Sequence, residues 1–159
     1  MAQNTVAKQQ RSRLDETDRA IIRRLQSDGR MPFSRLGPLV ELSPAAVRQR
    51  VLQLMEDGVM SIVAVTDPTA IGHRVQVMLG IKVQGDIDRV VGDLEAQPEV
   101  VYLVVTAGRF DLLAEIVCED TTRLLEILQG IRMQPGVQSA EVFSYLRLAK
   151  QTYNWGVPE

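Results

Sequence analysis

Apolar residues at helical spacing divide the front of the chain into three short helices. The most sharply bounded of them begins at Pro44 and ends before Gly58, with an apolar stripe at Val47, Val51 and Leu54. Ser43 is suited to cap its first turn, and Pro44 fits the first helical position, where a missing N–H costs nothing. Gly58 provides the left-handed residue that ends such a helix.

Two earlier helices complete this pattern. Asp15 caps the first, which ends near Gly29 and has its apolar stripe at Ile21, Ile22 and Leu25. A shorter helix follows, marked by Ser34, Leu36, Leu39 and Val40, and Glu41-Leu42 forms the turn into the third. Three helices of this spacing, the last two joined by a tight turn, predict a helix-turn-helix unit.

The outward face of the third helix is slim and polar. Two alanines lie near its start, and Gln and Arg are side chains that pair with base edges in the major groove. An ordinary amphipathic helix with a solvated face explains this segment alone equally well. The candidate DNA-binding residues are Ser34, Ser43, Pro44, Ala45, Ala46, Arg48, Gln49, Arg50 and Gln53. Arg50 lies nearer the apolar stripe than Arg48, so an acidic partner within the chain is its alternative to phosphate.

The second part of the chain alternates strands and helices. Strands are expected at Val75–Val83, Val100–Thr106, Leu112–Cys118 and Gln138–Leu146, and helices begin after Asp86 and at Thr121. The stops Gln97-Pro98-Glu99-Val100 and Gln134-Pro135-Gly136-Val137 are near copies. This doubled β-α-β order predicts a ferredoxin-like α/β sandwich, giving an α+β protein overall.

One face of that sheet has no cover within the chain, although its strands carry apolar residues on both sides. A second copy is expected to bury it, which predicts a homodimer. A dimer also suits the helix-turn-helix, because one such unit reads half of a site.

The stretch between the two parts contains a β-branched run, Val59 to Val65, which is expected to form a strand. The turn-rich residues 67–72 then form a hinge. The expected organisation is a flexible arm at 1–13, a winged helix-turn-helix at 14–60, a linker strand and hinge at 61–73, a ferredoxin-like domain at 74–149 and a tail at 150–159.

Composition and charge indicate the cellular compartment and the kind of partner. A single cysteine excludes a disulfide within the chain, and without an apolar run long enough for a membrane span a cytoplasmic protein is expected. Residues 1–60 carry a net charge of +3 and residues 61–159 a net charge of −5. This asymmetry favours contact between the first part and a polyanion, with Lys8, Arg11 and Arg13 of the arm available to phosphate.

Motifs in both parts resemble the leucine-responsive/asparagine regulator (Lrp/AsnC) family: Leu14-Asp15-x-x-Asp18, Asp28-Gly29-Arg30, Leu42-Ser43-Pro44-x-x-Val47-x-x-Arg50-Val51-x-x-Leu54, Gly58, Asp67-Pro68 and Gly108-Arg109-Phe110-Asp111. The resemblance implies a transcription regulator and not an enzyme. Its partners would be double-stranded DNA and a small effector, usually an amino acid, with no cofactor. The second domain would dimerise and assemble further, often into octamers.

The same resemblance locates an effector site at the turn Ala107, Gly108, Arg109, Phe110 and Asp111, with Ala140 and Val142 on the last strand. A cation, a carboxylate and free amides are the groups that an amino acid requires. A hairpin glycine and an aspartate that satisfies its own backbone explain the turn equally well.

The chain also departs from the family pattern. Pro38, Glu41 and Leu52 occupy positions where the family usually has other residues, which suggests weaker DNA binding, and Ala140 and Val142 replace threonines. These departures suggest one alternative function, an effector-sensing oligomer with weakened DNA binding. The resemblance itself suggests another, an enzyme like the tetrapyrrole decarboxylases of similar architecture. A lone histidine, His73, argues against the enzyme and against a metal site.

Overall fold

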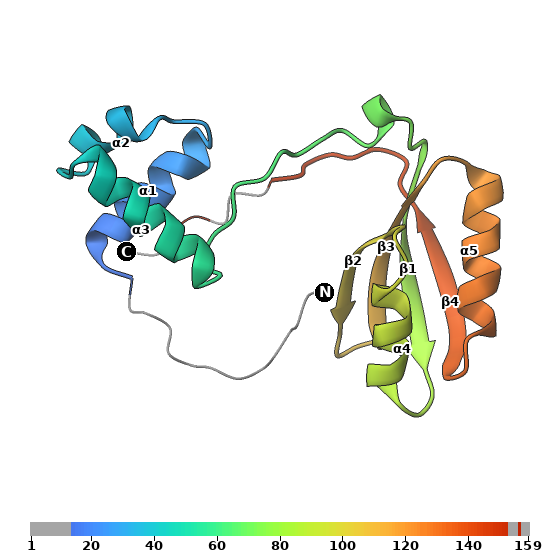
Figure 1. The fold of residues 1–159 in the computed structure, drawn as a ribbon. Helices are drawn as coiled ribbons and strands as arrows, with labels where there is room; N and C mark the ends of the chain where they lie inside the picture. The colour runs from blue at the N-terminus through green and yellow to red at the C-terminus, as the bar shows by residue number, and fades with distance from the viewer. Residues whose placement is uncertain (1–13, 153–155, 157–159) are drawn as a thin grey trace. The chain divides into compact units, whose positions relative to one another are not determined.

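The computed structural model describes residues 14–152 and 156 (Figure 1). The described chain forms two compact units, one within residues 14–64 and the other at residues 65–150. The division falls within the stretch 61–73 that the sequence assigns to a linker. The predicted flexible arm at 1–13 lies outside the described residues.

The first unit is built from α1 (Glu16–Ser27), α2 (Phe33–Leu39) and α3 (Pro44–Glu56). Asp15 begins α1 with a capping box, in which its carboxylate accepts from the Asp18 N–H while the Asp18 carboxylate accepts from the Asp15 N–H. The apolar faces of the three helices meet in one core, formed by Ile21, Ile22, Leu25, Leu36, Val40, Val47, Val51 and Leu54. Each buried residue of α3 is one that the sequence assigns to its apolar stripe.

The turn between α2 and α3 is tight at Gly37. A Cβ on this buried glycine would come within 2.6 Å of the Leu42 carbonyl oxygen, so a larger residue does not fit there without movement. Helix α2 continues past Pro38 and ends one residue later. Glu41 then adopts a positive φ of 57°, a conformation that favours glycine.

The predicted strand from Val59 to Val65 is wrong. No residue of this segment is in a strand, and residues 61–67 are all exposed, with Val63 at 69%. Their β-branched side chains favour extended backbone, but a strand also needs a hydrogen-bonded neighbour. The helix-turn-helix therefore has no strand as a wing within residues 14–64.

The second unit is a four-stranded antiparallel sheet in the order β2-β3-β1-β4, with two helices on one face (Figure 1). The elements are β1 (Val75–Val83), α4 (Ile87–Glu95), β2 (Val100–Val105), β3 (Leu112–Cys118), α5 (Thr121–Met133) and β4 (Val137–Ser144), with a short 3₁₀ helix at Thr69–Ile71 before them. The α+β class and the ferredoxin-like order are confirmed.

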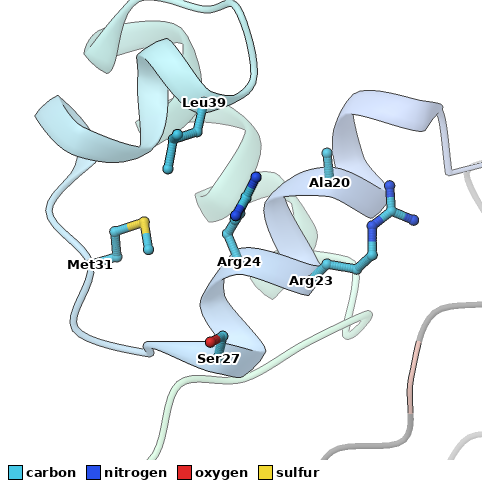
Figure 2. Close-up of a pocket in the computed structure, with 6 residues that line it drawn as sticks. All are labelled: Ala20, Arg23, Arg24, Ser27, Met31 and Leu39. Atoms are coloured by element: carbon cyan, nitrogen blue, oxygen red, sulfur yellow. The ribbon is translucent and has the colours of Figure 1, made fainter.

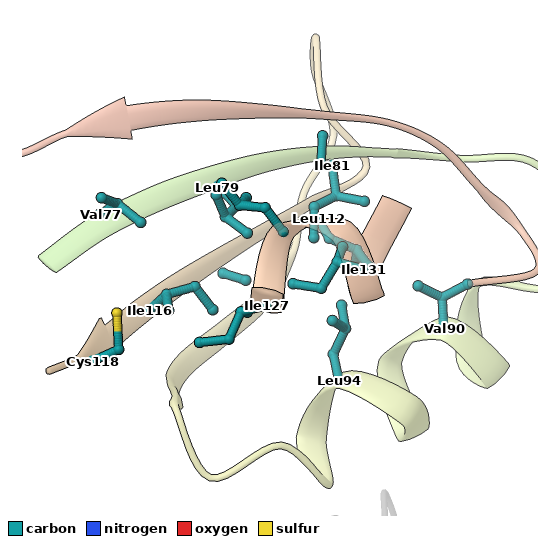
Figure 3. Close-up of a cluster of buried hydrophobic side chains, with 13 residues drawn as sticks. Val77, Leu79, Ile81, Val90, Leu94, Leu112, Ile116, Cys118, Ile127 and Ile131 are labelled. Carbon is teal, nitrogen blue, oxygen red and sulfur yellow. The ribbon is translucent and has the colours of Figure 1, made fainter. Parts of the chain in front are cut away.

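The core of this unit lies between the sheet and its two helices. Figure 3 shows alternate residues of β1, Val77, Leu79 and Ile81, facing side chains of α4 and α5. The two near-identical stops close the helices alike. The N–H groups of Val100 and Val137 each donate to the carbonyl of the glutamine three residues earlier, at 3.1 Å.

The opposite face of the sheet has no helix over it within residues 65–150. Alternation places Met78 of β1 and Leu113 of β3 on this face, together with the exposed rings of Tyr102 and Phe143. We call it the open face. Its apolar side chains have no cover within residues 65–150, which is the arrangement that the sequence predicts.

Candidate DNA-binding and effector sites

Helix α3 presents a polar surface away from its core. Its start is fixed by the Ser43 hydroxyl, which accepts from the Ala46 N–H at 3.2 Å, and by Pro44 in the first turn. Along the outward side four of the candidate residues are exposed: Ala45, Arg48, Gln49 and Gln53. Within the described part of the chain Arg48 is in none of the ion pairs, so its charge is available to a ligand.

Arg50 behaves differently from Arg48. Its Nη1 atom donates to Asp15 Oδ2 at 2.7 Å and to Asp18 Oδ1 at 2.8 Å, which ties α3 to the capping box of α1. The Asp18 N–H and, next, the Arg50 guanidinium hold the pKa of the Asp15 carboxyl below its ordinary value. Of the two roles that the sequence leaves open for Arg50, the structure shows the acidic partner.

The remaining DNA-binding candidates surround this face. Ser34 is exposed in the first turn of α2, and Ala46 is half-buried. Gln53 donates from Nε2 to Asp57 Oδ1 at 2.9 Å, a contact that a base edge would have to replace. Leu52 is 41% exposed, so an apolar side chain lies at the surface of α3 beside the candidate residues.

The loop between β2 and β3 is held by hydrogen bonds at both of its ends. The Asp111 carboxylate accepts from the Val83 N–H at 2.8 Å and lies 3.7 Å from Lys82 Nζ. The Thr106 hydroxyl donates to the Phe110 carbonyl at 2.7 Å. The Asp111 carboxylate therefore binds the backbone of the neighbouring strand β1.

Arg109 and Phe110 extend over the open face. The Arg109 guanidinium lies 5.2 Å from the centre of the Phe110 ring and pairs with Glu141 at 2.9 Å. The Phe110 ring packs edge-on against Phe143, with 5.8 Å between the ring centres. Two aromatic rings, a cation and a carboxylate thus meet at one end of the sheet, while Ala107 and Gly108 are exposed.

Ala140 and Val142 do not join this cluster. They pair with Ile81 and Leu79 and face the helices, where Ala140 is 8% exposed. The residues of β4 that reach the loop are their neighbours Glu141 and Phe143, which the sequence analysis missed. Side chains along a strand point alternately to opposite faces of the sheet. This alternation could have shown that Glu141 and Phe143 lie on the open face when Ala140 and Val142 face the helices.

A hollow of about 400 Å³ lies beside α1 in the first unit. Figure 2 shows its lining: Ala20, Arg23, Arg24 and Ser27 of α1, with Met31 and Leu39. None of these residues is a sequence-derived candidate, and none belongs to α3.

Cys118 is the last residue of β3, and its side chain is buried. Burial, the largest cause, raises the pKa of the Cys118 thiol. Among residues 14–152 and 156 no cluster of His, Cys, Asp or Glu could hold a metal ion. No helix in that part of the chain is long and apolar enough to cross a membrane.

Two family models match separate parts of the chain. The AsnC-type helix-turn-helix domain matches residues 14–55. A C-terminal dimeric alpha+beta barrel domain of AsnC-type transcription regulators matches residues 73–158.

Individual proteins give the same picture. The chain is 31% identical over 141 residues to the HTH-type transcriptional regulator FL11 of Pyrococcus horikoshii, covering 87% of this chain and 93% of that protein. The feast or famine regulatory protein of M. tuberculosis, solved in complex with L-methionine, has a TM-score of 0.81 at 28% identity, over 89% of this chain and 97% of that one. A transcriptional regulator of Neisseria meningitidis in complex with L-Met has a TM-score of 0.78 at 25% identity, over 91% and 96%.

Proposed function

Because the chain belongs to the Lrp/AsnC family of transcriptional regulators, we propose that it binds specific double-stranded DNA sequences through the outward face of α3. The observation that carries this proposal is the exposed set Ala45, Arg48, Gln49 and Gln53 on a helix whose opposite face is buried in the core. Small residues at the start of α3 permit close approach to a groove, and Arg and Gln supply paired donors.

Direct binding tests this proposal. Fluorescence anisotropy with a duplex selected from the chain's own genomic DNA should show binding that weakens with salt and is tighter than to a scrambled duplex of equal length. Arg48→Ala should reduce the affinity, because it removes an exposed cation. Equal affinity for both duplexes across the salt series would contradict the proposal. Intact oligomers that bind no DNA would instead identify the effector-sensing alternative.

We further propose that the second unit binds an amino acid near the loop from Ala107 to Asp111. Relatives solved with L-methionine support the ligand class, and Arg109 supplies a cation beside the apolar rings of Phe110 and Phe143. A thermal-shift screen of the amino acids should identify a ligand that raises the unfolding midpoint. Arg109→Ala should abolish that shift, and no shift with any amino acid would refute this ligand class.

The open face supports a dimer, since the matching C-terminal domain is dimeric. We propose that dimers assemble further, with an octamer as the expected size. Two α3 helices per dimer would then read two half-sites. Sedimentation equilibrium of the full chain measures this directly, and a dimer that does not associate further would contradict the octamer.

A further inference from the structure

Arg50 of α3 forms ion pairs within the chain. Arg50 bridges the two carboxylates of the α1 capping box, and those two residues lie 35 and 32 positions before it in the sequence. Asp18 is the more enclosed of the pair, with a side chain 14% exposed against 49% for Asp15.

This geometry opposes release of Arg50 to DNA. Turning its guanidinium toward a phosphate would leave the enclosed Asp18 carboxylate without its cation, and uncompensated charges in sheltered sites are costly. The side chain also lies at the edge of the buried face, since residue 50 follows Val47 by three positions and precedes Val51 by one. Arg48 projects from the other flank and is exposed.

We propose that Arg50 is a positioning residue: with Asp15 and Asp18 it forms a clamp that fixes α3 against α1, and it does not contact DNA. Affinity for DNA then depends on two carboxylates that never touch the nucleic acid. This inference rests on the proposed function, because it concerns how α3 is held in place for the groove.

The salt dependence of binding separates a clamp from a phosphate contact. Each phosphate neutralised by a cation adds about 0.9 to the slope of log affinity against log salt concentration. With the full chain and a labelled mixed-sequence duplex, Arg48→Gln should reduce the slope by about that amount. Arg50→Gln should leave the slope unchanged and lower the affinity by a constant factor of about two to five, as expected for loss of a partly exposed ion pair.

For a variant of the Asp18 carboxylate, the clamp and the phosphate contact predict opposite changes in DNA affinity. If Arg50 contacted DNA, Asp18→Asn would free it and strengthen binding, whereas the clamp predicts weaker binding. Glu56→Gln is the matched control, because it removes one exposed carboxylate of α3 for which no ion pair is seen in the described chain. The affinity of Asp18→Asn should fall below that of this control.

Arg50→Lys keeps the test decisive if the glutamine variant does not fold. Lysine retains the charge but holds two carboxylates less well than the planar guanidinium. The clamp predicts reduced affinity with an unchanged slope, and a phosphate contact predicts wild-type affinity. The proposal is overturned if Arg50→Gln lowers the slope as Arg48→Gln does, or if Asp18→Asn binds more tightly than the control. Failure of the wild-type chain to bind any duplex would instead remove the proposed function, and this inference with it.

Discussion

Gly80 lies directly beneath the ring of Phe110, so that a Cβ on Gly80 would come within 2.6 Å of ring carbons Cδ2 and Cε2. The absence of a side chain at this point in β1 lets the β2–β3 loop close over the open face. The same ring meets Phe143 of β4, so the loop contacts two strands at once. The glycine in this strand therefore leaves space for an aromatic ring to pack against the backbone.

Gly80→Ala should therefore destabilise the second unit. The added methyl group displaces Phe110 and its contact with Phe143, at a cost of about 1–3 kcal/mol in the free energy of unfolding. Urea denaturation measures this change. Gly130→Ala is the control, because that exposed glycine of α5 has open space around it and alanine should stabilise the helix by about 0.5–1 kcal/mol. Equal stabilisation by both variants would show that Phe110 does not need the glycine.

Glu41→Gly should stabilise the first unit. Glu41 is held at a φ of 57°, where an L side chain is strained and glycine is not. The expected gain is about 0.5–1 kcal/mol, less than the full strain because glycine also increases the entropy of the unfolded chain. Chemical denaturation checks this, with Glu56→Gln as a control for the lost charge. A loss of stability would show that the carboxylate makes a compensating contact.

Leu113→Glu should shift the chain from dimer toward monomer. Leu113 lies at the middle of the open face, paired with Gly80 on one side and Val104 on the other. A carboxylate there would have to be buried without a partner when two sheets meet. Analytical ultracentrifugation should show a dissociation constant raised by at least about tenfold. Leu125→Glu, on the exposed side of α5, should leave the dimer intact. An unchanged dimer in the first variant would place the interface elsewhere.

Tyr145 should titrate late. Burial and, second, its hydrogen bond to the Glu115 carboxylate raise the pKa of Tyr145 to about 12 from an ordinary 10.0. Because the folded-state pKa is the higher one, its contribution to stability is complete below pH 10 and is lost as the pH rises toward 12. Ultraviolet titration of the phenolates should show one late group that disappears in Tyr145→Phe. A late group that persists in this variant would belong to another tyrosine.

The sequence was most informative where a local pattern decides the outcome. The sequence predicts β1, through strict alternation, and also β3 with the bounds that the structure has, and Ser43 and Asp15 cap their helices as expected. It failed for Val59–Val65, because β-branched side chains favour extended backbone without supplying a neighbouring strand.

Contacts between distant residues were beyond the sequence pattern. The pairing of Arg50 with Asp15 and Asp18 depends on how α1 and α3 pack. On β4 the family resemblance indicated Ala140 and Val142, which face the core, whereas Glu141 and Phe143 reach the loop. The family resemblance pointed to residues on the helix-covered face of β4, whereas the residues beside the loop lie on its open face. The register of β4 with β1 shows which residues lie on each face.

The central claim is that the outward face of α3 reads base sequence. Its most direct test is the ratio of affinities for a duplex selected by the wild-type chain and for a scrambled duplex, compared between wild type and Gln49→Ala. Loss of one base contact should reduce the discrimination between the two duplexes by about 1–3 kcal/mol, which lowers the ratio of affinities by roughly 5- to 150-fold. The affinity for the scrambled duplex should stay within about twofold of the wild-type value. An unchanged ratio in a folded Gln49→Ala variant would contradict the account.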